Sequence, residues 1–305
     1  MSWEEEFIRA LQAVANPALD AFFRAITELG SDLPWLLVIA FCFAFGRRKQ
    51  AIGLSVLVIS SFYVSYALKH IIMRPRPPAE LQRTDVIGAL KTGPSMPSTH
   101  ATEAASNLAY VAKELRDVRA YVACAVLAIL AALSRVYLGV HWPTDVLAGL
   151  GLGFSLMILY ALIAEGELAA RANLLEERKA YFILVPVVLG VLAAIFTPQE
   201  WGRPSTYIGG LIAGSFSGAL LSGPIEGRDP RDKGDLIRAF ACVLIGLMGL
   251  MGSYLLGFGA IQFLAATLVG LWVSWIGPKA LWAIGGQKGA VSGGQSGLTA
   301  PSQGH

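Results

Sequence analysis

The sequence predicts an all-α fold: a polytopic bundle of about nine transmembrane helices preceded by an amphipathic helix. The first observation is composition. Of the 305 residues, 55% are hydrophobic and 15% are charged, whereas a soluble globular domain carries about 25% charged residues. The second observation is grouping, because the apolar residues fall into runs near the roughly 20 residues that cross a bilayer. The net charge of +3 is too small to indicate a nucleic-acid partner.

Residues 1–30 predict an amphipathic segment that lies in the membrane interface. Apolar and charged residues alternate there at helical spacing, which gives a helix one apolar face. That face comprises Trp3, Phe7, Ile8, Leu11 and Val14. The alternative is a helix whose apolar face packs on the protein itself. The acidic start "MSWEEEF" lacks the basic region expected of a cleavable signal peptide.

Nine apolar runs follow, and each is a candidate membrane span. They cover residues 31–46, 51–72, 99–113, 118–137, 144–165, 180–197, 207–223, 236–256 and 259–277. Composition shifts divide the chain into a helical core, a charged cytoplasmic linker, a four-helix membrane extension and a Gly/Ser-rich tail that we expect to be disordered. The corresponding ranges are 31–165, 166–179, 180–280 and 281–305.

Basic residues in short loops predict the orientation. Alternate loops carry Arg47–Lys49, then clusters within 113–119, 171–179 and 228–238, and two lysines follow the last helix. We therefore expect an integral membrane protein whose C-terminus is cytoplasmic and whose N-terminus is outside.

Three polar segments lie on the opposite, extracytoplasmic side of this layout, each at a helix end. They read "KHIIMRPRPP", "PSTH" and "SRVYLGVHWPTD". The first and third supply the cations Lys69, Arg76 and Arg135, which are costly at a membrane face unless an anion occupies the cluster. Arginine matches phosphate oxygens with paired donors, and Ser98 and Thr99 stand at a helix N-terminus, where backbone N–H groups bind anions. The pattern predicts a phosphate site.

Two histidines are candidates for the chemistry. His141 precedes Asp145 by four residues, so the carboxylate is able to fix the imidazole tautomer and leave the other nitrogen as a nucleophile or base. His100 lies beside the helix N-terminus, where it is placed to protonate a leaving oxygen. No metal or other cofactor is expected, since the three cysteines are far apart and show no metal-ligand spacing.

These segments resemble the signature motifs of the type 2 phosphatidic acid phosphatase superfamily, which read K-x6-RP, PSGH and SR-x5-H-x3-D. Here they are Lys69 to Arg76-Pro77, Pro97 to His100, and Ser134-Arg135 to His141 and Asp145, with Thr99 in place of the usual glycine. The "MPSTH" form is similar to that of sphingosine-1-phosphate phosphatases, and the nine-helix layout is also similar to glucose-6-phosphatases. The resemblance covers residues from about 30 to 165.

The resemblance implies a role for each site residue. His141 attacks phosphorus and becomes phosphohistidine, Asp145 orients it, and His100 protonates the leaving group. The phosphoryl oxygens are held by Lys69, Arg76, Ser98, Thr99 and Arg135. The implied protein is a metal-independent membrane phosphatase that hydrolyses lipid phosphate monoesters or polyprenyl diphosphates at the extracytoplasmic face.

Other functions remain open at this point. One is a phosphatase for a small soluble phosphate such as a sugar phosphate, and another is a lipid phosphotransferase that uses a hydroxyl acceptor instead of water. A transporter or an inactive relative would tolerate loss of His141 or Arg135, and both are present. The expected partners are a lipid phosphate or isoprenyl phosphate and the membrane, and the oligomeric state is undetermined.

Overall fold

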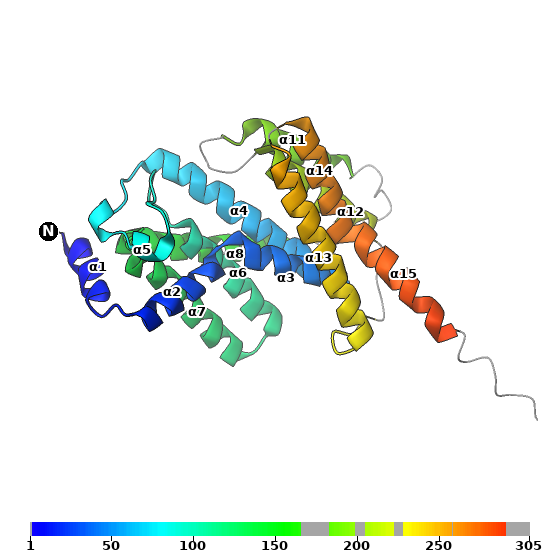
Figure 1. Cartoon of the computed structure of the whole chain (residues 1–305), viewed down its shortest axis with the longest axis horizontal. Coiled ribbons are helices and arrows are strands. Elements are labelled where there is room, and N and C mark those ends of the chain that lie inside the picture. The colour runs from blue at the N-terminus through cyan, green and yellow to red at the C-terminus, as the bar shows by residue number, and fades with distance from the viewer. Residues whose placement is uncertain (1, 166–182, 199–204, 223–227, 258, 291–305) are drawn as a thin grey trace, which may run out of the picture. The chain divides into compact units, whose positions relative to one another are not determined.

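The computed structural model describes residues 2–165, 183–198, 205–222, 228–257 and 259–290, and all regular structure within these ranges is helical (Figure 1). The chain forms two compact units. The first comprises residues 1–39 and 49–178, and the second comprises residues 40–48 and 179–305. Each unit is described separately below.

The first unit contains the three polar segments. Its long helices begin with α3 (Asp32–Ala44), which continues into the second unit, followed by α4 (Arg48–Ile72), α6 (Thr99–Leu115), α7 (Val118–Tyr137) and α8 (Pro143–Glu165). Its shorter elements are α1 (Trp3–Ala13), α2 (Pro17–Thr27), α5 (Thr84–Ile87) and the 3-10 turns η1 (Glu28–Gly30) and η2 (Ala79–Leu81).

The second unit consists of α11 (Leu184–Phe196), α12 (Ser205–Leu221), α13 (Lys233–Leu255), α14 (Ala260–Leu271), the π-helical segment η5 (Trp272–Ile276) and α15 (Gly277–Ala290). Glycines allow its helices to approach closely, as expected for packing inside a membrane. A Cβ on Gly214 of α12, for example, would lie 2.1 Å from the backbone oxygen of Thr267 in α14.

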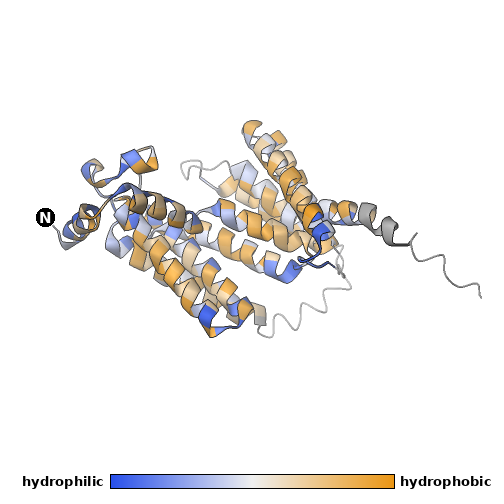
Figure 2. Ribbon diagram, turned by 60° about the horizontal axis from the view of Figure 1, so that its bottom comes forward, coloured by the Kyte–Doolittle hydropathy of each residue, from blue (hydrophilic) through white to orange (hydrophobic). Residues whose placement is uncertain are grey.

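Five helices of the described residues are long and apolar enough to cross a membrane. They are α4, α7, α8, α13 and the continuous stretch Ala260–Ala283, and a sixth span results if Pro17–Gly30 and Asp32–Ala44, which meet at 54°, count as one. Figure 2 shows apolar residues along most of these helices. The protein is therefore an integral membrane protein, whereas the number of nine spans stays a prediction.

Helix α6 is central to the first unit, although it is not among the five candidate spans. It packs against both α7 and α8. The close contact with α8 depends on Gly149 and Gly153, since a Cβ at these positions would lie 2.6 Å from the Ser98 oxygen and 2.4 Å from the Thr102 oxygen. The starts of the two helices are also joined directly, because the Ser98 N–H donates to the Asp145 backbone oxygen at 3.0 Å.

The N-terminal segment differs from the single amphipathic helix that the sequence predicts. Asn16 caps α2 by accepting hydrogen bonds from the first-turn amides, and Pro17 starts the helix, so the segment is broken into α1 and α2. Ile8 of α1 is fully buried in a cluster with Leu81 and Ala101. Ile8 and Leu11 thus pack on the protein, as in the alternative above, whereas Trp3, Phe7 and Val14 of the same face are exposed. Location at the membrane interface stays a prediction.

The predicted boundary of the disordered tail is wrong for residues 281–290, because helix α15 continues to Ala290. This helix is anchored by the tertiary partners of Trp282. Its indole N–H donates to the Asp235 carboxylate at 2.8 Å, and the Arg228 guanidinium lies 4.0 Å from its ring centroid. Residues 291–305 and the predicted linker at 166–179 lie outside the described residues.

Candidate active site

The first two polar segments are joined just beyond the end of α4. Lys69 is buried in the last turn of α4, and its Nζ donates to the backbone oxygens of Ser95 at 2.8 Å and Pro94 at 3.2 Å. Ser95 in turn donates its N–H to the Arg74 oxygen and its hydroxyl to the oxygens of Arg74 and Pro75. The loop before α6 is therefore fixed against the loop that carries Arg76.

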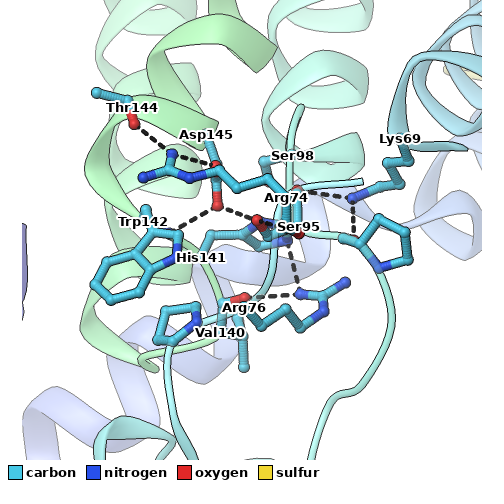
Figure 3. Close-up of polar contacts among 12 residues, drawn as sticks. Lys69, Arg74, Arg76, Ser95, Ser98, Val140, His141, Trp142, Thr144 and Asp145 are labelled. Atoms are coloured by element: carbon cyan, nitrogen blue, oxygen red, sulfur yellow. Dashed lines mark hydrogen bonds and ion pairs between the residues drawn. The ribbon is translucent and has the colours of Figure 1, made fainter. Parts of the chain in front are cut away.

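Arg76 connects the first segment to the third. Its Nη1 donates to the Val140 oxygen at 2.7 Å and lies 3.2 Å from His141 Nε2 (Figure 3). Because a guanidinium has no acceptor, this contact requires a lone pair on Nε2 and places the imidazole proton on Nδ1. His141 Nδ1 lies 3.5 Å from Asp145 Oδ2, an ion-pair distance that is too long for an ordinary hydrogen bond.

The surroundings of His141 favour its neutral form. Burial lowers the pKa of His141 well below its ordinary value, and the nearby Lys69, Arg76 and Arg135 lower it further, as does His100. A lowered pKa means that the imidazole stays unprotonated to lower pH. The neutral imidazole has the lone pair that a nucleophile needs.

Asp145 is fully buried in the first turn of α8. Its Oδ2 accepts the Trp142 N–H at 2.9 Å, and its Oδ1 accepts from Arg74 Nη1 at 2.7 Å. Figure 3 shows the Arg74 guanidinium lying between Thr144 and Asp145. Arg74 is not among the predicted site residues, and its sequence signal is an additional cation two residues before Arg76.

The start of α6 carries Ser98, Thr99 and His100. Ser98 precedes the helix with an extended backbone, and its hydroxyl makes no capping hydrogen bond. Thr99 is the first helical residue. Non-glycine residues with positive φ are, within the described ranges, only Met73 and Arg116, so the helical backbone at Thr99 suits threonine and does not require glycine. His100 is packed against η1, where a Cβ on Gly30 would lie 2.4 Å from the His100 oxygen.

Several buried polar atoms near these residues lack a hydrogen-bond partner within the part of the chain that the structure describes. They include Ser98 Oγ, Thr99 Oγ1 and Arg135 Nε, although Arg135 Nη1 donates to Thr27 Oγ1 at 3.0 Å. A buried polar atom without a partner costs about 1–3 kcal/mol. Two hydroxyls and one guanidinium N–H are suitable partners for phosphoryl oxygens.

The structure therefore brings the three segments together around His141. Arg76 Nη1 lies 3.2 Å from His141 Nε2, and Asp145 Oδ2 lies 3.5 Å from His141 Nδ1. The Ser98 N–H is bonded to the Asp145 backbone oxygen. Lys69, Arg135 and His100 act on His141 electrostatically. The described residues contain no group of three or more His, Cys, Asp or Glu side chains that could hold a metal ion.

Comparison with known proteins identifies the family. The model of the PAP2 superfamily matches residues 50–167, which include all three segments. Phosphatidylglycerophosphatase B of Bacillus subtilis is 33% identical over 175 residues, covering 52% of this chain and 81% of that protein. Undecaprenyl-diphosphatase of Sulfolobus acidocaldarius is 31% identical over 136 residues, covering 42% of this chain and 62% of that protein.

Among solved structures, a transmembrane PAP2-type phosphatidylglycerolphosphate phosphatase from Bacillus subtilis matches with a TM-score of 0.46 and 31% identity, covering 53% of this chain and 84% of that one. The family match and the 33% identity over most of a known phosphatase agree with the motifs in the sequence. The chain belongs to the PAP2 superfamily and is a membrane phosphatase.

Proposed function

We propose that this protein hydrolyses lipid phosphate monoesters or polyprenyl diphosphates through a phosphohistidine intermediate at His141. The observation that carries the proposal is the setting of His141, a buried neutral imidazole whose Nε2 faces Arg76 and whose Nδ1 faces Asp145. Lys69 and Arg135 complete the cationic surroundings. A phosphoryl group bound among these cations would present its phosphorus to Nε2.

The reaction then follows in two balanced steps. In the first, the Nε2 lone pair forms a P–N bond while the bond from phosphorus to the leaving oxygen breaks, and His100 gives that oxygen a proton. In the second, water attacks the phosphohistidine, His100 takes the proton from the water, and the P–N bond breaks to release phosphate. Asp145 stabilises the imidazolium character of His141, and the cations offset the charge on the phosphoryl oxygens.

The depth of the site supports a lipid substrate. Lys69 lies in the last turn of the candidate span α4, and Asp145 lies in the first turn of the candidate span α8. A lipid would leave its chain in the bilayer while its headgroup enters the site, which avoids a transfer cost of about 0.8 kcal/mol per CH₂. The two relatives, whose names refer to phosphatidylglycerophosphate and undecaprenyl diphosphate, also favour a lipid.

The substrate class is tested by comparing kcat/KM in mixed micelles for phosphatidate, a long-chain-base phosphate, an isoprenyl phosphate and glucose 6-phosphate. We expect at least one lipid to exceed the sugar phosphate by more than about 100-fold, since chain contacts worth only about four CH₂ groups suffice for that ratio. A preference for glucose 6-phosphate would overturn the lipid proposal and favour the soluble-phosphate alternative.

Hydrolysis is expected to be independent of metal. The charge on the phosphoryl group is offset by Lys69, Arg76 and Arg135, so incubation with EDTA should leave kcat within about two-fold of the untreated enzyme. Orthovanadate should inhibit, because its five-coordinate form resembles the transition state. Loss of activity in EDTA that Mg²⁺ restores would contradict this prediction.

We also propose that the site faces the extracytoplasmic side and that the N-terminus is outside. The support is the basic loop at Arg47–Lys49, which the positive-inside rule assigns to the cytoplasm. In a variant without Cys42, Cys124 and Cys242, an impermeant thiol reagent should label Leu90→Cys but not Lys49→Cys in intact cells. Both positions are exposed, so both should label after permeabilisation. Labelling of Lys49→Cys in intact cells would refute the orientation.

A further inference from the structure

A chain of ion pairs extends from the nucleophile to the N-terminal helix. Asp145, which faces His141 through Oδ2, accepts Arg74 Nη1 through Oδ1 at 2.7 Å. The other terminal nitrogen of the same guanidinium, Nη2, donates to Glu4 Oε2 at 2.5 Å. Both pairs are shielded, since the side chains of Asp145, Glu4 and Arg74 are 0%, 12% and 25% exposed. The order of charges from His141 outward is negative, positive, negative.

Glu4 is also bonded to the start of α8. Its Oε1 accepts the Thr144 hydroxyl at 2.6 Å and the Thr144 N–H at 3.2 Å. Thr144 is the second residue of α8, where N–H groups lack intrahelical partners and a carboxylate is favoured by the helix dipole. The Thr144 hydroxyl further accepts from Arg74 Nη1 at 2.5 Å. Glu4 therefore holds both Arg74 and the turn from which Asp145 projects.

The position of Glu4 is fixed by the packing of α1. Ile8 is fully buried, and Gln12 Nε2 donates to the backbone oxygens of Leu81 at 2.8 Å and Tyr137 at 2.9 Å. Burial by itself raises the pKa of Glu4, but hydrogen bonds from Thr144 and Arg74 outweigh it, and the pKa lies below its ordinary value. Glu4 is thus held as a carboxylate.

The charges of Arg74 and Glu4 explain why the site requires both residues. Arg74 fixes one oxygen of Asp145 and leaves the other directed at His141. An unmatched Arg74, however, would withdraw from His141 part of the negative charge that stabilises the imidazolium. Glu4 offsets that cation.

We propose that Arg74 and Glu4 are positioning residues for phosphoryl transfer: Arg74 fixes Asp145 behind His141, and Glu4 fixes Arg74 and offsets its charge. This proposal rests on the function proposed above. Under this proposal, helix α1 contributes to the active site by holding Glu4 in position.

The test uses the full-length enzyme with Glu4→Gln, Arg74→Gln, the double variant and the matched control Glu6→Gln, which changes an exposed glutamate on the same helix. We expect kcat to fall about 10- to 100-fold in each single variant while KM changes less than about three-fold, because a displaced catalytic group costs rate and not ground-state binding. The control should stay within about two-fold of wild type.

The pH profile separates this role from a merely structural one. The acid limb of kcat/KM reports the pKa of His141, which must be neutral to attack. Loss of the negative charge in Glu4→Gln should move that limb to lower pH, and loss of the positive charge in Arg74→Gln should move it to higher pH. Arg74→Lys keeps the charge and should leave the limb in place. The other charged groups facing His141 are unchanged in all variants, namely Lys69, Arg76, His100, Arg135 and Asp145.

The double variant tests whether the two residues act together. If Glu4 acts mainly through Arg74, the loss in the double variant should be clearly smaller than the product of the single losses. Multiplicative losses, limbs that move in the same direction, or wild-type kcat in Glu4→Gln and Arg74→Gln would each overturn the proposal. An inactive His141→Ala measured alongside would show that the proposed function stands even when this inference fails.

Discussion

His141→Ala is expected to abolish phosphate release while the protein remains folded. The substitution removes Nε2, the atom that the proposed mechanism uses to form a bond with phosphorus. Removal of a covalent nucleophile costs on the order of 10⁴-fold or more in kcat. Phosphate release from a lipid phosphate in mixed micelles is the measurement.

The matched control is His70→Ala. His70 is exposed, lies next to Lys69 in the last turn of α4, and bonds through Nδ1 to the Tyr66 backbone oxygen. This variant should retain activity within about three-fold, and thermal unfolding in detergent should be similar for both variants. Activity near the wild-type level in His141→Ala would refute the assignment of the nucleophile.

His100→Ala is expected to show a loss that depends on the leaving group. A lipid alkoxide needs a proton as it departs, so removal of the acid should lower kcat by about 10²- to 10⁴-fold. With p-nitrophenyl phosphate the departing oxyanion is already stable, and the rate of the first step should fall less than about ten-fold. Single-turnover kinetics with the two substrates measure these rates.

The second step gives an independent readout for the same variant. If His100 also activates the water, His100→Ala should accumulate an acid-labile phosphoenzyme with p-nitrophenyl phosphate. This species should be absent from the double variant with His141→Ala. Equal losses with both substrates, with no phosphoenzyme, would show that His100 is not the general acid.

Most of the helical core was predictable from the sequence because it depends on local information. The run 118–137 predicts α7 at its observed bounds, and the runs 51–72 and 144–165 predict α4 and α8 to within three residues at each end. An apolar run of a given length defines a span without reference to the rest of the chain. The three polar segments were also recognisable in the sequence, since the spacing within each segment is short and each segment lies at a helix end.

The N-terminal segment and residues 281–290 depend on contacts with residues that are distant in the sequence. The predicted single helix over residues 1–30 is divided at Pro17, and Ile8 is covered by residues that are distant in the sequence. Residues 281–290 have the glycine-rich composition of a flexible tail, yet they continue a helix that Trp282 anchors to Asp235 and Arg228. Packing partners decided both cases, and composition does not identify partners.

The sequence by itself determined that the protein is helical, that it crosses a membrane, and that its three polar segments carry cations and two histidines, from which a phosphate site is predicted. Only the tertiary structure shows that Arg74 contacts Asp145 and that Glu4 contacts Arg74 and Thr144. Arg74 is 71 residues from Asp145, and Glu4 is 140 residues from Thr144. No periodicity or spacing connects residues so far apart, because ion pairs of this kind form only after helix packing has brought α1 to the start of α8.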